Sequence, residues 1–153
     1  MIKSKRFEPI HEIASTSARD LSRAMGDAGR KVTEMERQLA QLQAYRDEYV
    51  RTSTQSSGAM DAVKLQNYRS FLNRLGEALN QQQKSLDGAR QEFEKRRMQW
   101  SEKRIEAESL NRVVDRFRKE EQSAADRREQ REGDDAAMRL MLARSDTGRF
   151  KRP

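Results

Sequence analysis

The chain has 153 residues, of which only 34% are hydrophobic and 37% are charged. An ordinary globular domain needs about half of its residues apolar, so this composition excludes a thick core. It does fit the narrow seam between paired helices, which needs about two apolar positions in seven. The formal net charge of +7 favours acidic partners, whether nucleic acid, an anionic membrane or an acidic protein surface.

Nothing in the sequence predicts secretion, membrane insertion or catalysis. The absence of cysteine excludes disulfides and thiolate metal sites, and the first thirty residues lack the apolar run of a signal peptide. The best apolar cluster, Ala136 to Ala143, is short and interrupted by Arg139. His11 is the only histidine. We therefore expect a cytoplasmic chain with no transmembrane segment, no enzymatic activity, no cofactor and no metal.

An apolar stripe predicts a first long helix over about residues 7–50. Its stations follow one another by alternate steps of three and four residues, the spacing of a coiled coil. Two successive steps of four through Ala28 make a stutter, which locally unwinds the supercoil, and Gly26 and Gly29 lie at the same place. Pro9 fits the first turn of this helix, where its missing N–H is no loss. The stations are Phe7, Ile10, Ala14, Ser17, Leu21, Ala24, Ala28, Val32, Met35, Leu39, Leu42, Arg46 and Tyr49.

A Ser- and Thr-rich segment without apolar stations predicts a turn at about residues 51–60. A second stripe then runs from Leu65 to Leu142 without a stutter and predicts a second helix over about residues 61–132 or longer. Gly133 is a candidate end for this helix, and residues 145–153 are expected to be a flexible basic tail. Because a short connection forces two long helices to be antiparallel, the fold class is all-α, a single antiparallel coiled-coil hairpin over residues 1–153.

Laying the two stripes against each other predicts a register for the hairpin. Tyr49 then faces Leu65, and Phe7 faces Ala107. In this register the first helix ends near residue 7, so everything after about Leu110 lacks a partner.

Two sets of residues near the turn share one side of their helices and make the first candidate site. Tyr45 and Phe71 lie beside the apolar stripes, where exposed aromatic rings next to apolar residues are typical of interaction surfaces. The alternative is that these residues only widen the seam. We call this set the flank patch: Gln38, Leu42, Tyr45, Tyr49, Phe71, Leu75, Ala78 and Gln82.

A basic stretch of the second helix makes the other candidate site. In the predicted register it lies near Lys3, Lys5 and Arg6, so the hairpin has a basic end suited to an acidic cavity or to phosphates. A solvated charged face explains the same residues. Arg96 and Lys103 also belong to the apolar stripe, where charged residues often set the register of a coiled coil. The stretch contains Arg90, Lys95, Arg96, Arg97, Lys103 and Arg104.

The order and spacing of several segments across both predicted helices resemble the flagellar FliJ family. These segments are the helix start at Pro9, Tyr45-Arg-Asp-Glu-Tyr49, Gln66-Asn-Tyr-Arg-Ser-Phe71, Trp100 and the charged run from Asp126 to Glu132. The resemblance covers nearly the whole chain. It implies a cytoplasmic component of the flagellar type III export apparatus, peripherally associated with the inner membrane, with a fold similar to the central shaft of rotary ATPases.

The resemblance also implies partners. Such a rod binds the export ATPase FliI and its regulator FliH, promotes assembly of the ATPase ring, links it to the export gate protein FlhA and interacts with export chaperones. The gate-contacting residues of the family match the flank patch, although a histidine often found at the last position is Gln82 here. The shaft analogy assigns a basic end to the ATPase: Lys3, Lys5, Arg6, Arg96, Arg97 and Arg104.

Two other classes of function fit the sequence. One is the equivalent stalk protein of a virulence type III secretion system. The other is a basic coiled coil that binds nucleic acid or serves a structural role. We expect no nucleic acid, because the aromatic residues lie at the opposite end of the predicted hairpin from the basic ones, which does not suit a stacking groove.

Overall fold

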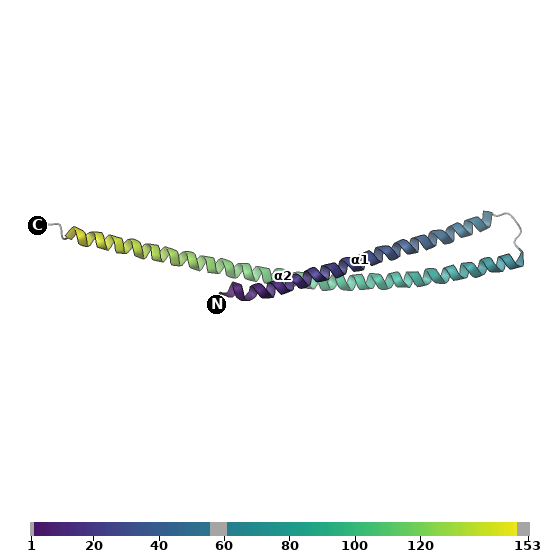
Figure 1. Ribbon diagram of the computed structural model, residues 1–153, viewed down its shortest axis with the longest axis horizontal. Helices are drawn as coiled ribbons and strands as arrows, with labels where there is room; N and C mark the ends of the chain where they lie inside the picture. The colour runs from purple at the N-terminus through teal and green to yellow at the C-terminus, as the bar shows by residue number, and fades with distance from the viewer. Residues whose placement is uncertain (1, 56–60, 150–153) are drawn as a thin grey trace. The chain divides into compact units, whose positions relative to one another are not determined.

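The computed structural model describes residues 2–55 and 61–149. These residues form two long helices, α1 (Lys3–Gln55) and α2 (Ala62–Arg149), which pack against each other (Figure 1). The expected all-α helical hairpin is therefore confirmed. Residues 56–60 of the expected turn and residues 150–153 of the expected tail lie outside the described residues.

The first helix begins earlier than the sequence indicates, at Lys3, so Pro9 lies inside it. A proline there removes one helical hydrogen bond and crowds the carbonyl four residues before it, which belongs to Lys5. Both Lys5 and Pro9 are exposed, so water can satisfy that carbonyl. Contacts of the first turns with α2, described below, hold these residues in the helix.

The second helix has a side-chain cap at its start and continues through Gly133, the candidate end. The Asp61 carboxylate accepts a hydrogen bond from the backbone N–H of Lys64 at 2.8 Å, which satisfies one of the free donors of a helix N-terminus. The helix then passes through Gly133 to Arg149. One glycine costs a helix only about 1 kcal/mol relative to alanine, and the residues that follow, from Ala136 to Ala143, are mostly good helix formers.

The chain folds as two compact units, each built from a segment of α1 and a segment of α2. The hairpin unit is Thr16–Arg104, and the terminal unit is Met1–Ser15 with Ile105–Pro153. Within each unit the two segments run antiparallel, because residues later in α1 meet residues earlier in α2.

The hairpin unit has a thin core of aliphatic side chains along its seam. Leu39, Leu79 and Leu86 are buried together, and further aliphatic residues pack around them. Every one of these residues is a station of the two predicted stripes, because burial selects positions that return to the same side of the helix. The surrounding residues are Val32, Met35 and Leu42.

The terminal unit has a second short seam. Ala14, Ala107 and Val114 are buried there, and the Phe7 and Phe117 rings lie 5.4 Å apart between centroids. Residues 122–148 of α2 are exposed throughout. In this unit, α2 therefore has a partner as far as Glu121, further than the predicted limit near Leu110.

The predicted register is wrong in both units. In the hairpin unit Tyr49 packs on Tyr68 and Phe71, and Leu65 is 38% exposed. In the terminal unit Phe7 meets Phe117 and not Ala107. The prediction assumed that the first helix ends near residue 50, whereas α1 continues to Gln55. Aromatic rings also favour tilted or offset contacts with other rings, and Tyr49 accordingly pairs with the rings on α2 and not with the side chain of Leu65.

Candidate protein-binding surfaces

Four aromatic rings of the hairpin unit form a chain of contacts close to the end of α1. Tyr45 meets Phe71 edge-on with 6.4 Å between ring centroids, and Tyr49 contacts Phe71 at 4.5 Å. Tyr49 also stacks on Tyr68 at 5.5 Å. The structure thus brings together the aromatic members of the flank patch. It adds Tyr68, which is not a member of the flank patch.

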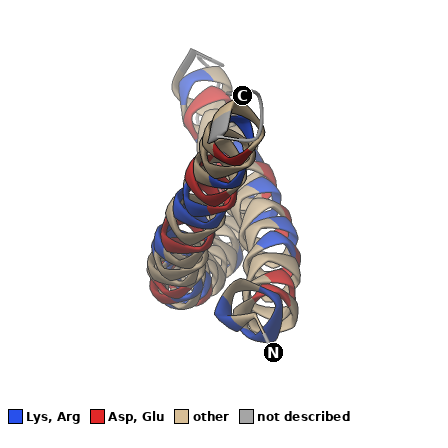
Figure 2. Ribbon diagram, turned by 90° about the vertical axis from the view of Figure 1, so that its left-hand side faces the viewer, with Lys and Arg blue, Asp and Glu red and all other residues tan. Residues whose placement is uncertain are grey.

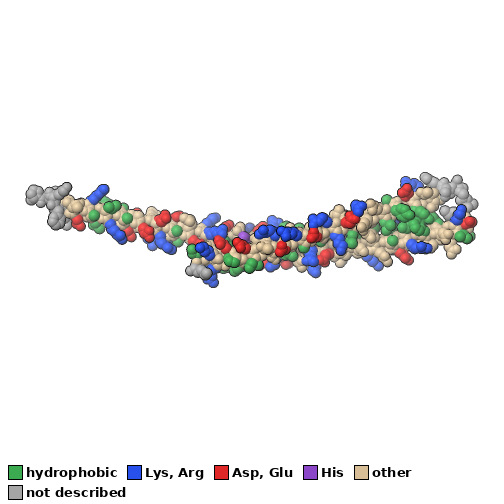
Figure 3. Space-filling model, in the orientation of Figure 1, with side chains coloured by type: hydrophobic (Ala, Val, Ile, Leu, Met, Phe, Trp, Pro, Cys, Tyr) green, Lys and Arg blue, Asp and Glu red, His purple; other side chains and the backbone are tan. Residues whose placement is uncertain are grey.

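The residues of the flank patch differ in exposure. Leu75 is buried and Leu42 packs against the core, so these two residues belong to the seam. Tyr45 is 53% exposed, and Gln38 and Ala78 are exposed beside it. Figure 3 shows hydrophobic side chains gathered over this part of the hairpin unit. The flank patch therefore consists of buried seam residues and an exposed aromatic ring on one side of them.

Polar groups continue the patch across the seam. The Gln82 amide donates a hydrogen bond to the Gln38 side-chain oxygen at 3.1 Å. Gln38 in turn donates to Glu34 at 3.3 Å. The pKa of Glu34 lies below its usual value of 4.5, chiefly because Arg37 donates hydrogen bonds to its carboxylate. Glu34 therefore stays ionised at neutral pH and holds the Gln38 amide in place.

The six basic residues assigned to one end of the predicted hairpin belong to two different units. Arg96, Arg97 and Arg104 are in the hairpin unit, whereas Lys3, Lys5 and Arg6 are in the terminal unit. Figure 2 shows that cationic and anionic residues are interspersed along both helices. The basic residues are consequently not a single cluster within either unit.

The hairpin-unit arginines already have partners on their own helix. Arg96 pairs with Glu92 at 3.0 Å, and Arg97 donates to Glu94 through both its Nε and its Nη2 atoms. The Arg97 guanidinium holds the pKa of Glu94 below its usual value through these hydrogen bonds. The Arg104 guanidinium lies 5.4 Å from the centroid of the Trp100 ring.

The basic residues of the terminal unit are freer. The Lys3 ammonium lies over the Phe117 ring at 5.6 Å, but Lys5 and Arg6 make no ion pair with any residue that the structure describes. An exposed cation without a nearby carboxylate attracts an anionic partner more strongly than a cation that is already ion-paired.

The terminal unit contains a contact of Glu121 that the sequence did not predict. The Glu121 carboxylate accepts the backbone N–H of Ser4 at 3.0 Å and the Ser4 hydroxyl at 2.7 Å. The first N–H groups of a helix lack helical partners and carry partial positive charge, so this carboxylate caps α1. The Ser4 hydroxyl is the main reason that the pKa of Glu121 is lowered. Beside it, Glu8 forms an ion pair with Arg118.

A family model described as Flagellar FliJ protein matches residues 3–146. The chain belongs to the FliJ family. This family is a structural component of flagellar type III export and not a known enzyme, so the flagellar function expected from the sequence is supported over the alternatives. No curated protein and no solved structure matches the chain.

The described residues of this FliJ-family chain contain no cluster of metal-binding side chains and no candidate membrane span. No group of three or more metal-binding side chains occurs in residues 2–55 and 61–149. His11 lies 3.5 Å from the Ser15 hydroxyl, in a part-buried contact between neighbouring turns of α1. Within the same ranges no helix is both long and apolar enough to cross a bilayer.

Proposed function

We propose that this FliJ-family chain links the export ATPase to the export gate without catalysing a reaction. It binds FliI and its regulator FliH, promotes assembly of the ATPase ring, connects the ring to FlhA and interacts with export chaperones. It acts at the cytoplasmic side of the inner membrane, in peripheral association with the export apparatus. Family membership supports the setting, and the flank patch and the basic residues supply the candidate contacts.

The exposed Tyr45 ring is the observation that carries the assignment of a gate-binding surface. Tyrosine is enriched among residues that dominate protein interfaces, because a rigid ring covers a large area at low entropic cost. Phe71 supports the Tyr45 ring from one side, while Gln38 and Gln82 are already joined to each other across the seam. A partner therefore meets an ordered surface with one projecting aromatic anchor.

The ATPase contact is assigned to the basic residues. Lys5 and Arg6 are exposed and make no ion pair within the described part of the chain, which favours an acidic surface on the ATPase ring. Arg96, Arg97 and Arg104 are candidates as well, although acidic or aromatic neighbours occupy all three.

Tyr45→Ala is the first test. We expect it to weaken binding to FlhA by at least about thirtyfold. Truncating an aromatic anchor at the centre of an interface costs about 2 kcal/mol of binding free energy, which corresponds to this change in affinity. The free energy of unfolding should fall by only about 1 kcal/mol, since an aromatic pair contributes about 0.5–1.5 kcal/mol. Phe71→Ala is less suitable, because Phe71 also contacts Tyr49 in the seam.

Ile105→Ala is the control, since Ile105 is 61% exposed but lies in the terminal unit. Binding can be titrated with FlhA in detergent, and folding can be followed by circular dichroism on heating. Unchanged affinity in Tyr45→Ala, or an equal loss in Ile105→Ala, would argue against the flank patch as the gate-binding surface.

A further inference from the structure

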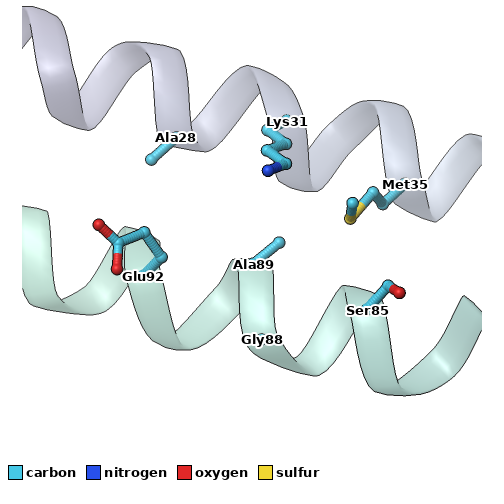
Figure 4. Close-up of a pocket in the computed structure, with 7 residues that line it drawn as sticks. All are labelled: Ala28, Lys31, Met35, Ser85, Gly88, Ala89 and Glu92. Atoms are coloured by element: carbon cyan, nitrogen blue, oxygen red, sulfur yellow. The ribbon is translucent and has the colours of Figure 1, made fainter.

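A hollow lies between α1 and α2 in the hairpin unit (Figure 4). Its volume is about 320 Å³. Ala28, Met35 and Ala89 form its apolar floor, and Ser85 and Gly88 are small enough to leave its α2 side open. Figure 4 shows Lys31 extending from α1 and Glu92 from α2 toward the space between the helices.

The heptad spacing places the hollow and the flank patch on the same side of the hairpin unit. In a coiled coil, residues seven positions apart return to the same side of their helix. Lys31 precedes Gln38 by seven residues, and Gln38 precedes Tyr45 by seven. On α2 the same spacing leads from the flank patch to Ser85 and then to Glu92. The hollow therefore lies on the same side of the seam as the flank patch, with the Gln38–Gln82 hydrogen bond between the hollow and Tyr45.

The opposite side of the same seam is closed. There Arg90 of α2 reaches across to Glu36 of α1 and forms an ion pair at 3.2 Å. Each of these two residues follows a seam station by one position, whereas Lys31 and Ser85 each precede a seam station by one position. The two pairs therefore lie on opposite sides of the seam. Beside the hollow the two flanks are thus unlike, since the Arg90–Glu36 ion pair crosses one of them and small side chains leave the other open. Further along the open flank, between the hollow and Tyr45, the Gln82–Gln38 hydrogen bond crosses the seam.

The charges at the hollow also point to a partner. Glu92 is paired with Arg96, whereas Lys31 makes no ion pair with a residue in the described ranges. The uncompensated charge beside the apolar floor is therefore the Lys31 ammonium. A carboxylate on the partner would complement it.

We infer that the flank patch and the hollow form a single groove for one amphipathic α-helix of the gate partner. This inference rests on the proposed function. Such a helix would place apolar residues on Tyr45 and in the hollow, and an acidic residue beside Lys31. Two heptads separate Tyr45 from Lys31, so the helix needs about 14 residues, or about 21 Å, to span them. Helices commonly bind apolar grooves in this way, with contacts every three or four residues.

Two glycines of α2 give a matched test. A Cβ added at Gly88 or at Gly76 meets no atom within 4 Å, so both positions have space for the first atom of a leucine side chain. Gly88 lines the hollow, whereas Gly76 lies one position past its seam station on the Arg90 side. We expect Gly88→Leu to weaken binding to FlhA in detergent by at least about tenfold, because it fills the hollow. Gly76→Leu should bind as the parent does.

Lys31→Glu provides a second variant, which reverses the charge at the hollow without adding a larger side chain. It should weaken FlhA binding to a similar extent, and added salt should reduce the parent's affinity toward that of the variant. Circular dichroism of all three variants verifies that the helices are intact.

The outcomes separate this inference from the proposed function. If Tyr45→Ala weakens binding but Gly88→Leu and Lys31→Glu do not, the partner stops at the flank patch and the inference is overturned, while the proposed function stands. If none of these variants changes affinity, the proposed gate contact fails as well. Loss of binding in Gly88→Leu and Lys31→Glu with Gly76→Leu unaffected supports the groove.

Discussion

At the scale of single residues, Gly26 and Gly29 differ in what a side chain would meet. A Cβ at Gly29 would lie 3.3 Å from Cε2 of Phe93, closer than an ordinary contact. At Gly26 the nearest atom is the flexible end of Arg30 at 3.7 Å. Gly29 therefore permits the close approach of the Phe93 ring to α1, whereas Gly26 has no such neighbour.

This difference predicts that alanine substitutions at the two glycines change the free energy of unfolding by different amounts. Gly26→Ala should raise the free energy of unfolding by about 0.5–1 kcal/mol, because alanine is the better helix former. Gly29→Ala should gain less or lose stability, since Phe93 must move to admit the methyl group. Urea unfolding of both variants measures the difference. An equal gain in both would mean that the Phe93 ring yields without cost.

At the scale of elements, the start of α1 depends on contacts with α2. The Glu121 carboxylate caps the helix through Ser4, and Phe7 packs on Phe117 one turn later. Glu8 then pairs with Arg118. These three ties explain why the helix tolerates Pro9 and begins at Lys3, which local sequence signals do not indicate.

The cap makes the first turns of α1 sensitive to acid. The folded pKa of Glu121 is lowered from 4.5, so its stabilisation is fully present above about pH 4.5 and is lost as the pH falls through the folded value. Arg118 faces the same carboxylate, while Glu8 and Asp115 face Arg118. We expect amide hydrogen exchange of residues 4–8, corrected for its intrinsic pH dependence, to lose protection at pH values well below 4.5.

Glu121→Gln separates the cap from other effects of acid. The neutral amide resembles the protonated carboxyl group, so this variant should show reduced protection of residues 4–8 already at neutral pH. Its protection should also change less with acid than that of the parent. Identical exchange in the variant and the parent would rule out Glu121 as the cap that holds α1.

The elements also show which features the sequence could predict. Burial along a seam imposes a 3.5-residue period, so the stations of both stripes, such as Leu39 and Leu86, could be read directly. The register could not, because it depends on how the shapes of Tyr49, Tyr68 and Phe71 fit across the seam.

The candidate site was predictable to a similar degree. Tyr45 and Phe71 were found from their position beside the stripes, and the structure brings their rings together. The hollow was not found, because it results from small residues on two helices, such as Ala28 and Gly88, that only the observed register places side by side. The Glu121 cap likewise joins residues far apart in the sequence.

At the scale of the whole molecule, the candidate ATPase-binding cations differ in whether they already form ion pairs. The net charge of +7 favours anionic partners, but it does not say which cations are available to them. In the hairpin unit Arg96 and Arg97 are engaged by Glu92 and Glu94. In the terminal unit Lys5 and Arg6 have no such partners among the described residues.

Two double variants that each remove a pair of positive charges can locate the ATPase contact. We expect Lys5→Gln with Arg6→Gln to raise the concentration needed for half-maximal stimulation of FliI several-fold. Arg96→Gln with Arg97→Gln should have a smaller effect, because an ion pair with Glu92 or Glu94 already offsets each arginine's charge. The measurement is the rate of ATP hydrolysis by FliI as this chain is added.

Salt provides the internal control for this comparison. Raising the ionic strength from about 0.1 M to about 1 M shortens the screening length from about 10 Å to about 3 Å, which should weaken stimulation by the parent. The Lys5/Arg6 variant should respond less to salt than the parent, since it has already lost the charges that are screened. A larger loss in the Arg96/Arg97 variant would instead assign the contact to the hairpin unit, and stimulation that does not change with salt would exclude an electrostatic contact with the ATPase.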